Sequence, residues 1–287
     1  MKPTPTPKRP ILRYHGGKWI LAPWIISHFP KHQIYVEPFA GAASVLLRKE
    51  RSYTEVYNDL DGEIVNVFRV MRSRKTAGEL EYVLKYTPYS REEFDLSHDL
   101  TAECEIERAR RTIVRSWFGV GTGSFSRAKG TGFRAGVKKR GTQPHRDWVK
   151  WKQLLHQFTD RLDGVVIESQ KAQKVIERND SERTLFYVDP PYPFEVRGKR
   201  WSGAGYKHEL QNPDHVLLLD QLKGVKGMVI ISGYDCEMYN DMLPDWRTDT
   251  RKAVSDGGKA GMVNRIEKIW ISPNTPAMRG KQLIIKL

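Results

Sequence analysis

The sequence has few cysteines, and this shortage excludes two ways of stabilising a fold. Only two occur among 287 residues, Cys104 and Cys236, so a disulfide framework is excluded and a cysteine-based zinc site is not expected. The eight histidines are scattered along the chain. We therefore expect no metal centre, and the low cysteine content is typical of a reducing compartment.

Long apolar runs are also absent. No stretch of about 18 apolar residues occurs, so we expect no membrane span and no membrane partner. Residues 1–10 are rich in Pro, Thr and Lys and lack the apolar segment of a secretory signal. We interpret them as a disordered tail and expect a cytoplasmic protein. The hydrophobic share of 39% is large enough to build a core.

Acidic residues are few relative to basic ones. The chain has 48 Lys and Arg against 34 Asp and Glu, which gives a formal net charge of +14. A surplus of this size favours a polyanionic partner such as nucleic acid or an anionic membrane.

The imbalance is greatest between Arg108 and Lys152, where 13 Lys and Arg accompany a single acid, Asp147. Glycines and aromatic residues interrupt these cations. We interpret the stretch as a flexible clamp for the phosphates and bases of a nucleic acid, although a solvated basic face with a few core aromatics is the alternative. The candidate DNA-binding residues here are Arg127, Lys129, Arg134, Lys138, Lys139 and Arg140.

Apolar segments alternate with helical periodicity in both halves of the chain. Segments 34–37 and 55–58 predict strands, each followed by a helical stretch, which is typical of a parallel α/β sheet. Further strands are expected at 164–168, 185–188, 226–232, 266–271 and 283–285. We predict a catalytic domain formed by 11–73 and 164–287, with a smaller, mainly helical insert at 74–163.

The expected strand at 185–188 runs into an Asp-Pro-Pro-Tyr tetrapeptide. Two prolines after a strand fix the backbone and leave carbonyls free to accept. The exocyclic amine of adenine offers two N–H donors, and the Asp189 carboxylate and the Pro190 carbonyl can accept one each. These bonds draw the nitrogen toward tetrahedral geometry, so that its lone pair can attack a sulfonium methyl group in line.

Tyr192 can stack on a base that has been lifted out of the duplex. The alternative is a rigid turn in which Asp189 caps a loop and Tyr192 packs at its rim. The candidate catalytic residues are Asp189, Pro190, Pro191 and Tyr192.

Small residues follow the first expected strand. Backbone at such a turn can approach a ligand closely, as in dinucleotide-binding folds, and an acid at the end of the second strand suits ribose hydroxyls. An ordinary strand–helix turn and a helix cap are the alternatives. Near the N-terminus, two glycines also allow close approach to a ligand and a lysine brings a cation, with a surface turn as the alternative. The candidate cofactor residues are Gly16, Gly17, Lys18, Glu37, Phe39, Gly41 and Asp59.

Together these motifs resemble those of the Dam-like (D12 class) adenine-N6 DNA methyltransferases, especially phage and prophage members. Segment 189–192 is similar to their catalytic motif, 37–41 to their cofactor loop, 14–18 to their aromatic-x-Gly-Gly-Lys motif and 58–61 to their second-strand acid. The motif order places target recognition between the cofactor loop and the catalytic motif. The resemblance covers about residues 11–272.

This resemblance implies a Rossmann-like α/β methyltransferase fold with a mostly parallel seven-stranded sheet and S-adenosyl-L-methionine as cofactor. It assigns cofactor contacts to Tyr14, Lys18 and Asp189. Tyr206 and Lys207 lie in a segment similar to one near the DNA in the family, with a helix start and a solvated charge cluster as the alternative. No metal is required, because the sulfonium charge already activates the methyl donor.

Two positions depart from the family pattern. Ala43 stands where many relatives carry a second glycine in the cofactor loop, which tightens the turn. After the strand that ends near Glu168, many relatives carry an acid that contacts the cofactor adenine, whereas this chain has Ser169-Gln170-Lys171. Gln170 is the candidate for that contact.

We therefore predict a site-specific DNA methyltransferase that acts on adenine N6 by base flipping, in a bacterium or a phage-infected cell. A cytosine-N4 enzyme, an RNA or protein amino-methyltransferase, and a non-catalytic DNA-binding protein that keeps the fold are the alternatives. GATC is a recognition sequence by analogy only. The sequence leaves open the oligomeric state and whether a restriction partner exists.

Overall fold

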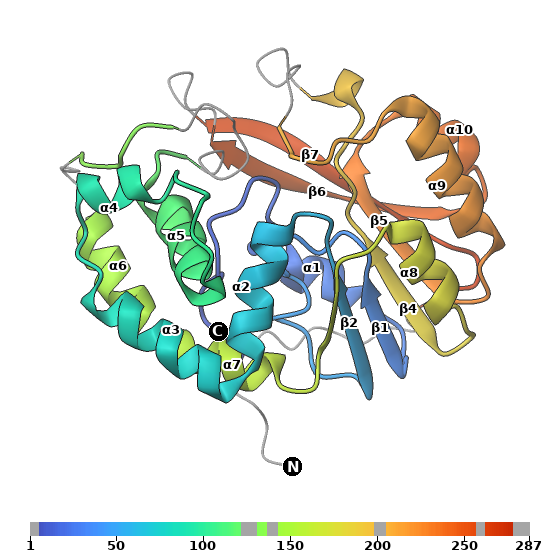
Figure 1. Ribbon diagram of the computed structural model, residues 1–287. Helices are drawn as coiled ribbons and strands as arrows, with labels where there is room; N and C mark the ends of the chain where they lie inside the picture. Colours follow the sequence, from blue (N-terminus) through green and yellow to red (C-terminus); the bar gives the residue numbers. More distant parts are fainter. Residues whose placement is uncertain (1–5, 122–130, 137–142, 198–204, 257–261, 278–287) are drawn as a thin grey trace, which may run out of the picture.

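The computed structural model describes residues 6–121, 131–136, 143–197, 205–256 and 262–277 (Figure 1). Within these ranges the chain forms a seven-stranded sheet in the order β3-β2-β1-β4-β5-β7-β6, with helices on both faces. The expected α/β fold with a mostly parallel seven-stranded sheet is confirmed. No helix in the described part of the chain is long and apolar enough to cross a membrane.

The parallel part of the sheet follows the apolar segments of the sequence. Its strands are β1 (Ile34–Glu37), β2 (Thr54–Asn58), β3 (Val166–Glu168), β4 (Thr184–Val188) and β5 (Met228–Tyr234). β1 pairs in parallel with both β2 and β4, while β2 pairs with β3 and β4 with β5. These strands are predicted to within two residues at each end.

The strand order reverses beside β1. The chain passes from β1 outward to β2 and β3, and then returns to form β4 on the other side of β1. Ligands of open α/β sheets bind at such a switch point, outside the carboxyl ends of the strands. Val36 pairs with Phe186, so the ends of β1 and β4 reach this edge together and bring Glu37 and Asp189 to it.

An antiparallel pair completes the sheet: β6 (Arg247–Asp256) and β7 (Met262–Ile271). β7 pairs with both β5 and β6. The sequence predicts β7 only from residue 266 and does not predict β6, whose residues 247–252 are exposed. β6 is the outermost strand, and such strands carry charged side chains in place of an apolar run. The expected strand at 283–285 lies outside the described residues.

Alternating side chains divide the core into two layers. In β4, Leu185 and Tyr187 face one layer, whereas Phe186 and Val188 face the other, because successive side chains of a strand point to opposite faces. The second layer lies against α8 (Ala172–Asn179), α9 (Asn212–Gly224) and α10 (Glu237–Met242), which Figure 1 shows together on one side. The first layer lies against α1 (Ala22–Ser27) and α2 (Gly62–Arg72).

Residues 74–163 contribute further helices to the first layer. These are α3 (Arg74–Tyr86), α4 (Arg91–Leu96), α5 (Glu105–Phe118), α6 (Pro144–Lys152) and α7 (Leu155–Leu162). Side chains such as Ile113, Trp148 and Phe158 belong to the same continuous core as Tyr35 and Tyr57 of the sheet. The helical character agrees with the sequence, and the division into a catalytic domain and an insert stays a prediction.

Two expectations from the sequence need correction, and the first concerns the aromatic residues of the basic stretch. Trp117, Phe118, Trp148 and Trp151 are buried and form stacked and edge contacts with one another, so these aromatic residues of the basic stretch build the core and do not face a ligand. They sit on the inner faces of α5 and α6, where helical spacing places them together.

The described end of the predicted tail is also ordered against α6. The Trp151 indole donates to the Pro10 carbonyl over 3.0 Å, Arg9 forms an ion pair with Asp147, and Pro7 is buried. For residues 6–10 the prediction of disorder is therefore wrong. The partners that hold these residues lie about 140 positions away in the chain. The composition of residues 1–10 does not reveal contacts at that distance along the chain.

A buried ion cluster ties α7 to the sheet. Glu55 of β2 accepts from Lys49 over 2.5 Å and from two nitrogens of Arg161 over 2.6 and 2.9 Å, and all three side chains are about 3% exposed. Buried charges are tolerated only when they are paired in this way.

Candidate active site

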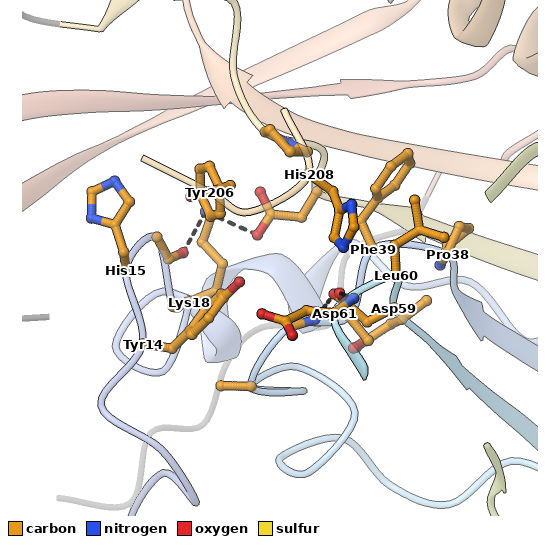
Figure 2. A pocket seen from close by; sticks show the side chains of 18 of the residues that line it. Tyr14, His15, Lys18, Pro38, Phe39, Asp59, Leu60, Asp61, Tyr206 and His208 are labelled. Atoms are coloured by element: carbon orange, nitrogen blue, oxygen red, sulfur yellow. Dashed lines mark hydrogen bonds and ion pairs between the residues drawn. The ribbon is translucent and has the colours of Figure 1, made fainter. Parts of the chain in front are cut away.

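A cleft opens at the carboxyl ends of β1, β2 and β4, at the switch point beside β1 (Figure 2). Its empty space is about 910 Å³, part of which is open to solvent. The residues that line it are 14–18, 37–42, Ser44, Val45, 59–61, Ala172, Tyr187, Asp189, Pro191 and 206–210.

The cleft collects the cofactor candidates with one exception. Tyr14, Gly16, Gly17, Lys18, Glu37, Phe39, Gly41, Asp59 and Asp189 all line it. Gln170 does not: its backbone is held by the Asn58 side chain, which donates to its carbonyl and accepts from its N–H, both over 2.9 Å, while Gln170 itself is exposed. The structure thus places Gln170 beside the cleft and outside its wall.

Glu37 fixes the turn after β1. Its Oε1 accepts from the Tyr35 hydroxyl over 2.6 Å and from the Leu46 N–H over 2.7 Å. Burial raises the pKa of Glu37 to about 8. The carboxyl therefore sits beneath the turn as an internal support.

Gly41 lies in the same turn with φ +48°, and a Cβ there would approach the Tyr14 ring to 2.8 Å. Only glycine fits this conformation and this contact without strain. Ala43, the departure from the family pattern, also takes a left-handed φ of 50°, where an L-residue is disfavoured.

Asp59 joins the ends of β1 and β2. Its two carboxylate oxygens accept from the N–H groups of Gly41 over 2.9 Å and of Asp61 over 2.8 Å. Burial raises the pKa of Asp59, while these two backbone donors lower it. The carboxylate lines the cleft with lone pairs to spare, which fits ribose hydroxyls.

The N-terminal motif and the segment 205–210 face each other. Gly16 has φ +73°, and a Cβ there would lie 2.3 Å from the Tyr206 hydroxyl. Glu209 holds this segment: it accepts from the backbone of Gly205 and Tyr206 over 2.7 and 2.8 Å and from both terminal nitrogens of Arg197.

Figure 2 shows Tyr14, Lys18 and Tyr206 on one side of the cleft and Phe39, Asp59 and Asp61 on the other. Lys207 reaches across, with its Nζ 3.4 Å from Asp61 Oδ1.

Asp189 lies where β4 ends and is surrounded by donors. Its Oδ2 is 3.0 Å from Lys18 Nζ, and its Oδ1 accepts from the Ser232 hydroxyl over 3.0 Å, with the Tyr192 hydroxyl at 3.1 Å. Ser232 is in turn hydrogen-bonded to the Tyr187 hydroxyl over 2.8 Å. Pro190 is buried, and Pro191 lines the cleft.

Lys18 is a buried cation inside this cluster. Its ammonium donates to the Gly16 carbonyl over 2.8 Å and lies 4.9 Å from the centre of the Tyr192 ring. Burial alone would lower the pKa of Lys18, but the carboxylates of Asp189 and Glu267 outweigh burial and raise the pKa above its ordinary value. The ammonium therefore stays charged.

Sequence reasoning missed two members of the cluster, Ser232 on β5 and Glu267 on β7. Glu267 accepts a short hydrogen bond from the Tyr192 hydroxyl and lies 3.5 Å from Lys18 Nζ. No local motif marks either residue. The pairing of β4 with β5, in which Val188 lies opposite Ile231, brings Ser232 to the site. The pairing of β5 with β7, in which Tyr234 lies opposite Glu267, brings Glu267 to it.

The basic stretch is only partly described. Arg127, Lys129, Lys138, Lys139 and Arg140 lie outside the described residues. Arg134 is described, and its guanidinium is 3.7 Å from Asp147, the acid within the stretch.

The arginines of α5 are engaged within the protein. Arg108 pairs with Glu63, Arg110 with Glu93 and Glu107, and Arg111 with Asp99 and Glu107, while Arg115 donates to the Ser97 carbonyl. These acids lie on α2, on α4, on α5 itself and in the segment before α5, and the DNA-binding role of the stretch stays a prediction.

In the part of the chain that the structure describes, no three His, Cys, Asp or Glu side chains converge as metal ligands.

Comparison with known proteins identifies a family. The family model described as "D12 class N6 adenine-specific DNA methyltransferase" matches residues 14–267. The DNA adenine methylases of Escherichia coli (strain K12) and Salmonella typhi are each 33% identical to this chain over 66 residues, which is 23% of this chain and 23% of theirs. That of Serratia marcescens is 30% identical over 66 residues, or 24% of its length. The similarity thus spans about a quarter of the curated relatives' length.

Proposed function

This chain belongs to the family of D12 class N6 adenine-specific DNA methyltransferases, and from that we propose that it transfers a methyl group from S-adenosyl-L-methionine to N6 of adenine in double-stranded DNA. The observation that carries the proposal is the Asp189 carboxylate, placed at the end of β4 in the wall of the cleft. The curated relatives of similar sequence are named DNA adenine methylases.

The cleft residues fit the proposed cofactor. Gly16, Gly17 and Gly41 let backbone approach a ligand, and the Asp59 carboxylate at the end of β2 suits ribose hydroxyls. Tyr14 and Phe39 add aromatic surface to the wall. When bound, the cofactor supplies a methyl group activated by a sulfonium charge.

The chain's own residues would activate the amine. Asp189 accepts one N–H of the exocyclic amine and the Pro190 carbonyl accepts the other, which keeps the nitrogen lone pair out of the ring. Tyr192 offers a ring for stacking on the flipped base, and that ring is braced edge-on by Tyr234 at a centroid distance of 4.8 Å. Hydrogen bonds prearranged at the reacting group are a major source of rate enhancement.

We further propose that residues 74–163, together with Tyr206 and Lys207, hold the DNA. The net charge of +14 supports a polyanionic substrate. The α5 arginines are bound to acids, so the proposal depends on the cations that follow α5 in the chain.

The identity of the methylated nucleoside tests the proposed function. Incubate the chain with labelled S-adenosyl-L-methionine and unmethylated plasmid DNA, digest the DNA, and separate the nucleosides. We expect label in N6-methyladenine. Asp189→Asn lowers the rate by roughly 100-fold or more, because the amide replaces one carboxylate oxygen with a donor and removes the negative charge beside the amine. Asp220→Asn, a change of the same chemistry at an exposed position of α9, leaves the rate unchanged. Label only in N4-methylcytosine, or none in DNA, refutes the proposal.

A further inference from the structure

Two carboxylates share the donors at the catalytic cluster. One is Asp189, and the other is Glu267 of β7, which is 3% exposed. The donors that lie within reach of one or both are the Lys18 ammonium and the hydroxyls of Tyr192 and Ser232. How these donors are divided decides how much of Asp189 remains open to a substrate amine.

The Tyr192 hydroxyl has one proton and two acceptors. It lies 3.1 Å from Asp189 Oδ1 and closer to Glu267 Oε1. Burial, followed by the charges of Asp189 and Glu267, holds the pKa of Tyr192 well above its ordinary value, so the hydroxyl stays a donor. The closer acceptor takes the proton, and Tyr192 is therefore directed to Glu267.

The donors of the Lys18 ammonium are also shared between the two carboxylates. An ammonium has three donors, and three acceptors surround this one: the Gly16 carbonyl at 2.8 Å, Asp189 Oδ2 at 3.0 Å and Glu267 Oε1 at 3.5 Å. Each N–H thus has its own acceptor, and only one of the three points to Asp189.

We infer that Glu267 is a positioning residue for methyl transfer: by taking the Tyr192 proton and one donor of Lys18, it leaves acceptor sites of Asp189 open for the substrate amine. The inference rests on the proposed function. A carboxylate has about four lone-pair sites, and with Glu267 present Lys18 and Ser232 occupy two of them. Without Glu267, the Tyr192 proton and the released Lys18 donor turn to Asp189 and compete with the amine, because buried donors do not remain unpaired.

The test combines substitutions at Glu267 and Tyr192. Single-turnover methylation of unmethylated plasmid DNA is measured with labelled S-adenosyl-L-methionine, and cofactor affinity by calorimetry. We expect Glu267→Leu to slow methyl transfer about 20-fold with the cofactor Kd changed less than about 3-fold, because the loss falls on the reacting group. Glu267→Gln, which keeps a carbonyl acceptor, stays within about 5-fold of the parent.

The sign of the double substitution distinguishes positioning from support of the fold. Adding Tyr192→Phe to Glu267→Leu removes the competing hydroxyl, so we expect the double variant to be about 3-fold faster than Glu267→Leu alone. A double variant that is slower than Glu267→Leu, or a Glu267→Leu enzyme as fast as the parent, overturns the inference.

Thermal unfolding of each variant checks the fold. If Glu267→Leu does not fold, Glu267→Gln is compared in the parent and Tyr192→Phe backgrounds, and the inference requires a smaller effect in the second background. Ile266→Gln, an exposed neighbour on β7, is the matched control and leaves the rate unchanged. A parent chain that methylates no adenine refutes the proposed function, and the inference with it. A parent chain that methylates adenine, at a rate that substitutions of Glu267 do not change, refutes the inference but not the proposed function.

Discussion

Glu37 is a single carboxyl on which the cofactor side of the cleft depends. It accepts from a side chain of its own strand and from the backbone beyond the turn. Its neighbourhood is apolar enough to raise its pKa to about 8, so the folded protein holds a proton there through much of the neutral range. The unfolded chain releases that proton at lower pH.

This difference predicts a pH dependence of stability. A group whose pKa is raised on folding stabilises the fold below its unfolded pKa, and this contribution is lost as pH rises from about 4.5 to about 8. Glu37→Gln carries no titrating proton at this position. We therefore expect the free energy of unfolding to fall more steeply in the parent than in the variant between pH 5.5 and 7.5, by up to about 2.5 kcal/mol over the range.

Urea denaturation at three pH values measures this slope. Glu81→Gln, at an exposed position of α3, serves as the control and keeps the parent's slope. Buried His215, whose pKa burial lowers to about 4, acts in the opposite direction, but it is common to all three proteins. Equal slopes in the parent and Glu37→Gln would show that Glu37 ionises normally.

Residues that act through a local motif could be predicted from the sequence, and residues that act across the sheet could not. Asp189 and Asp59 each follow an apolar strand, so their place at the carboxyl edge follows from strand polarity alone. Glu267 belongs to an antiparallel strand whose partner begins 34 positions earlier, and nothing near it in the chain indicates a site.

The helices also differ in what could and could not be predicted from the sequence. The sequence predicts helices between residues 74 and 163, and α3 to α7 are found there. It does not reveal that the inner faces of α5 and α6 turn their tryptophans into the core, nor that acids on α2, α4 and α5 pair with the α5 arginines. Composition counts charges, whereas only the packing of helices shows which charges are already paired.

The cations that follow α5 therefore carry the prediction for DNA binding. Replacing Lys138, Lys139 and Arg140 together with Gln is expected to weaken DNA binding and to flatten its salt dependence by about two to three units of the slope of log affinity on log salt, because each phosphate contact contributes about 0.9. Cofactor affinity stays unchanged. Fluorescence anisotropy with labelled duplex between 50 and roughly 200 mM salt measures both quantities.

Arg111→Gln is the matched control on α5. Its guanidinium forms ion pairs with Asp99 and Glu107. We therefore expect Arg111→Gln to bind DNA with the same salt slope as the parent. A triple variant with the parent's affinity and slope would place the DNA surface elsewhere, with the segment 206–209 as the next candidate.

Across the whole molecule, the cluster of Lys49, Glu55 and Arg161 connects the helical region to the sheet. Arg161 comes from α7, the last helix of the region, and Glu55 comes from β2. Removing one member leaves the remaining charges buried without full compensation. The helices and the sheet also share one apolar core, so we expect them to unfold as a unit.

Arg161→Met is expected to lower the free energy of unfolding by about 3–5 kcal/mol, in a single transition. Arg178→Met removes an exposed partner, whose side chain is 59% accessible beside Glu168, and is expected to cost no more than about 1 kcal/mol. Urea denaturation followed by tryptophan fluorescence reports both values. Two separate transitions in the parent would contradict the shared core, and a loss similar to that of Arg178→Met would contradict the role of the cluster.

The turn after β1 has a consequence for the energetics of ligand binding. Glu37 supports it from below, and Asp59 fastens it from the side through the Gly41 N–H. These bonds form when the chain folds, so this half of the cleft is already ordered before a ligand binds. Ligand binding therefore loses little conformational entropy in this half. A preorganised half-site of this kind converts contact energy into affinity with little loss, so stability and affinity are linked at these two acids.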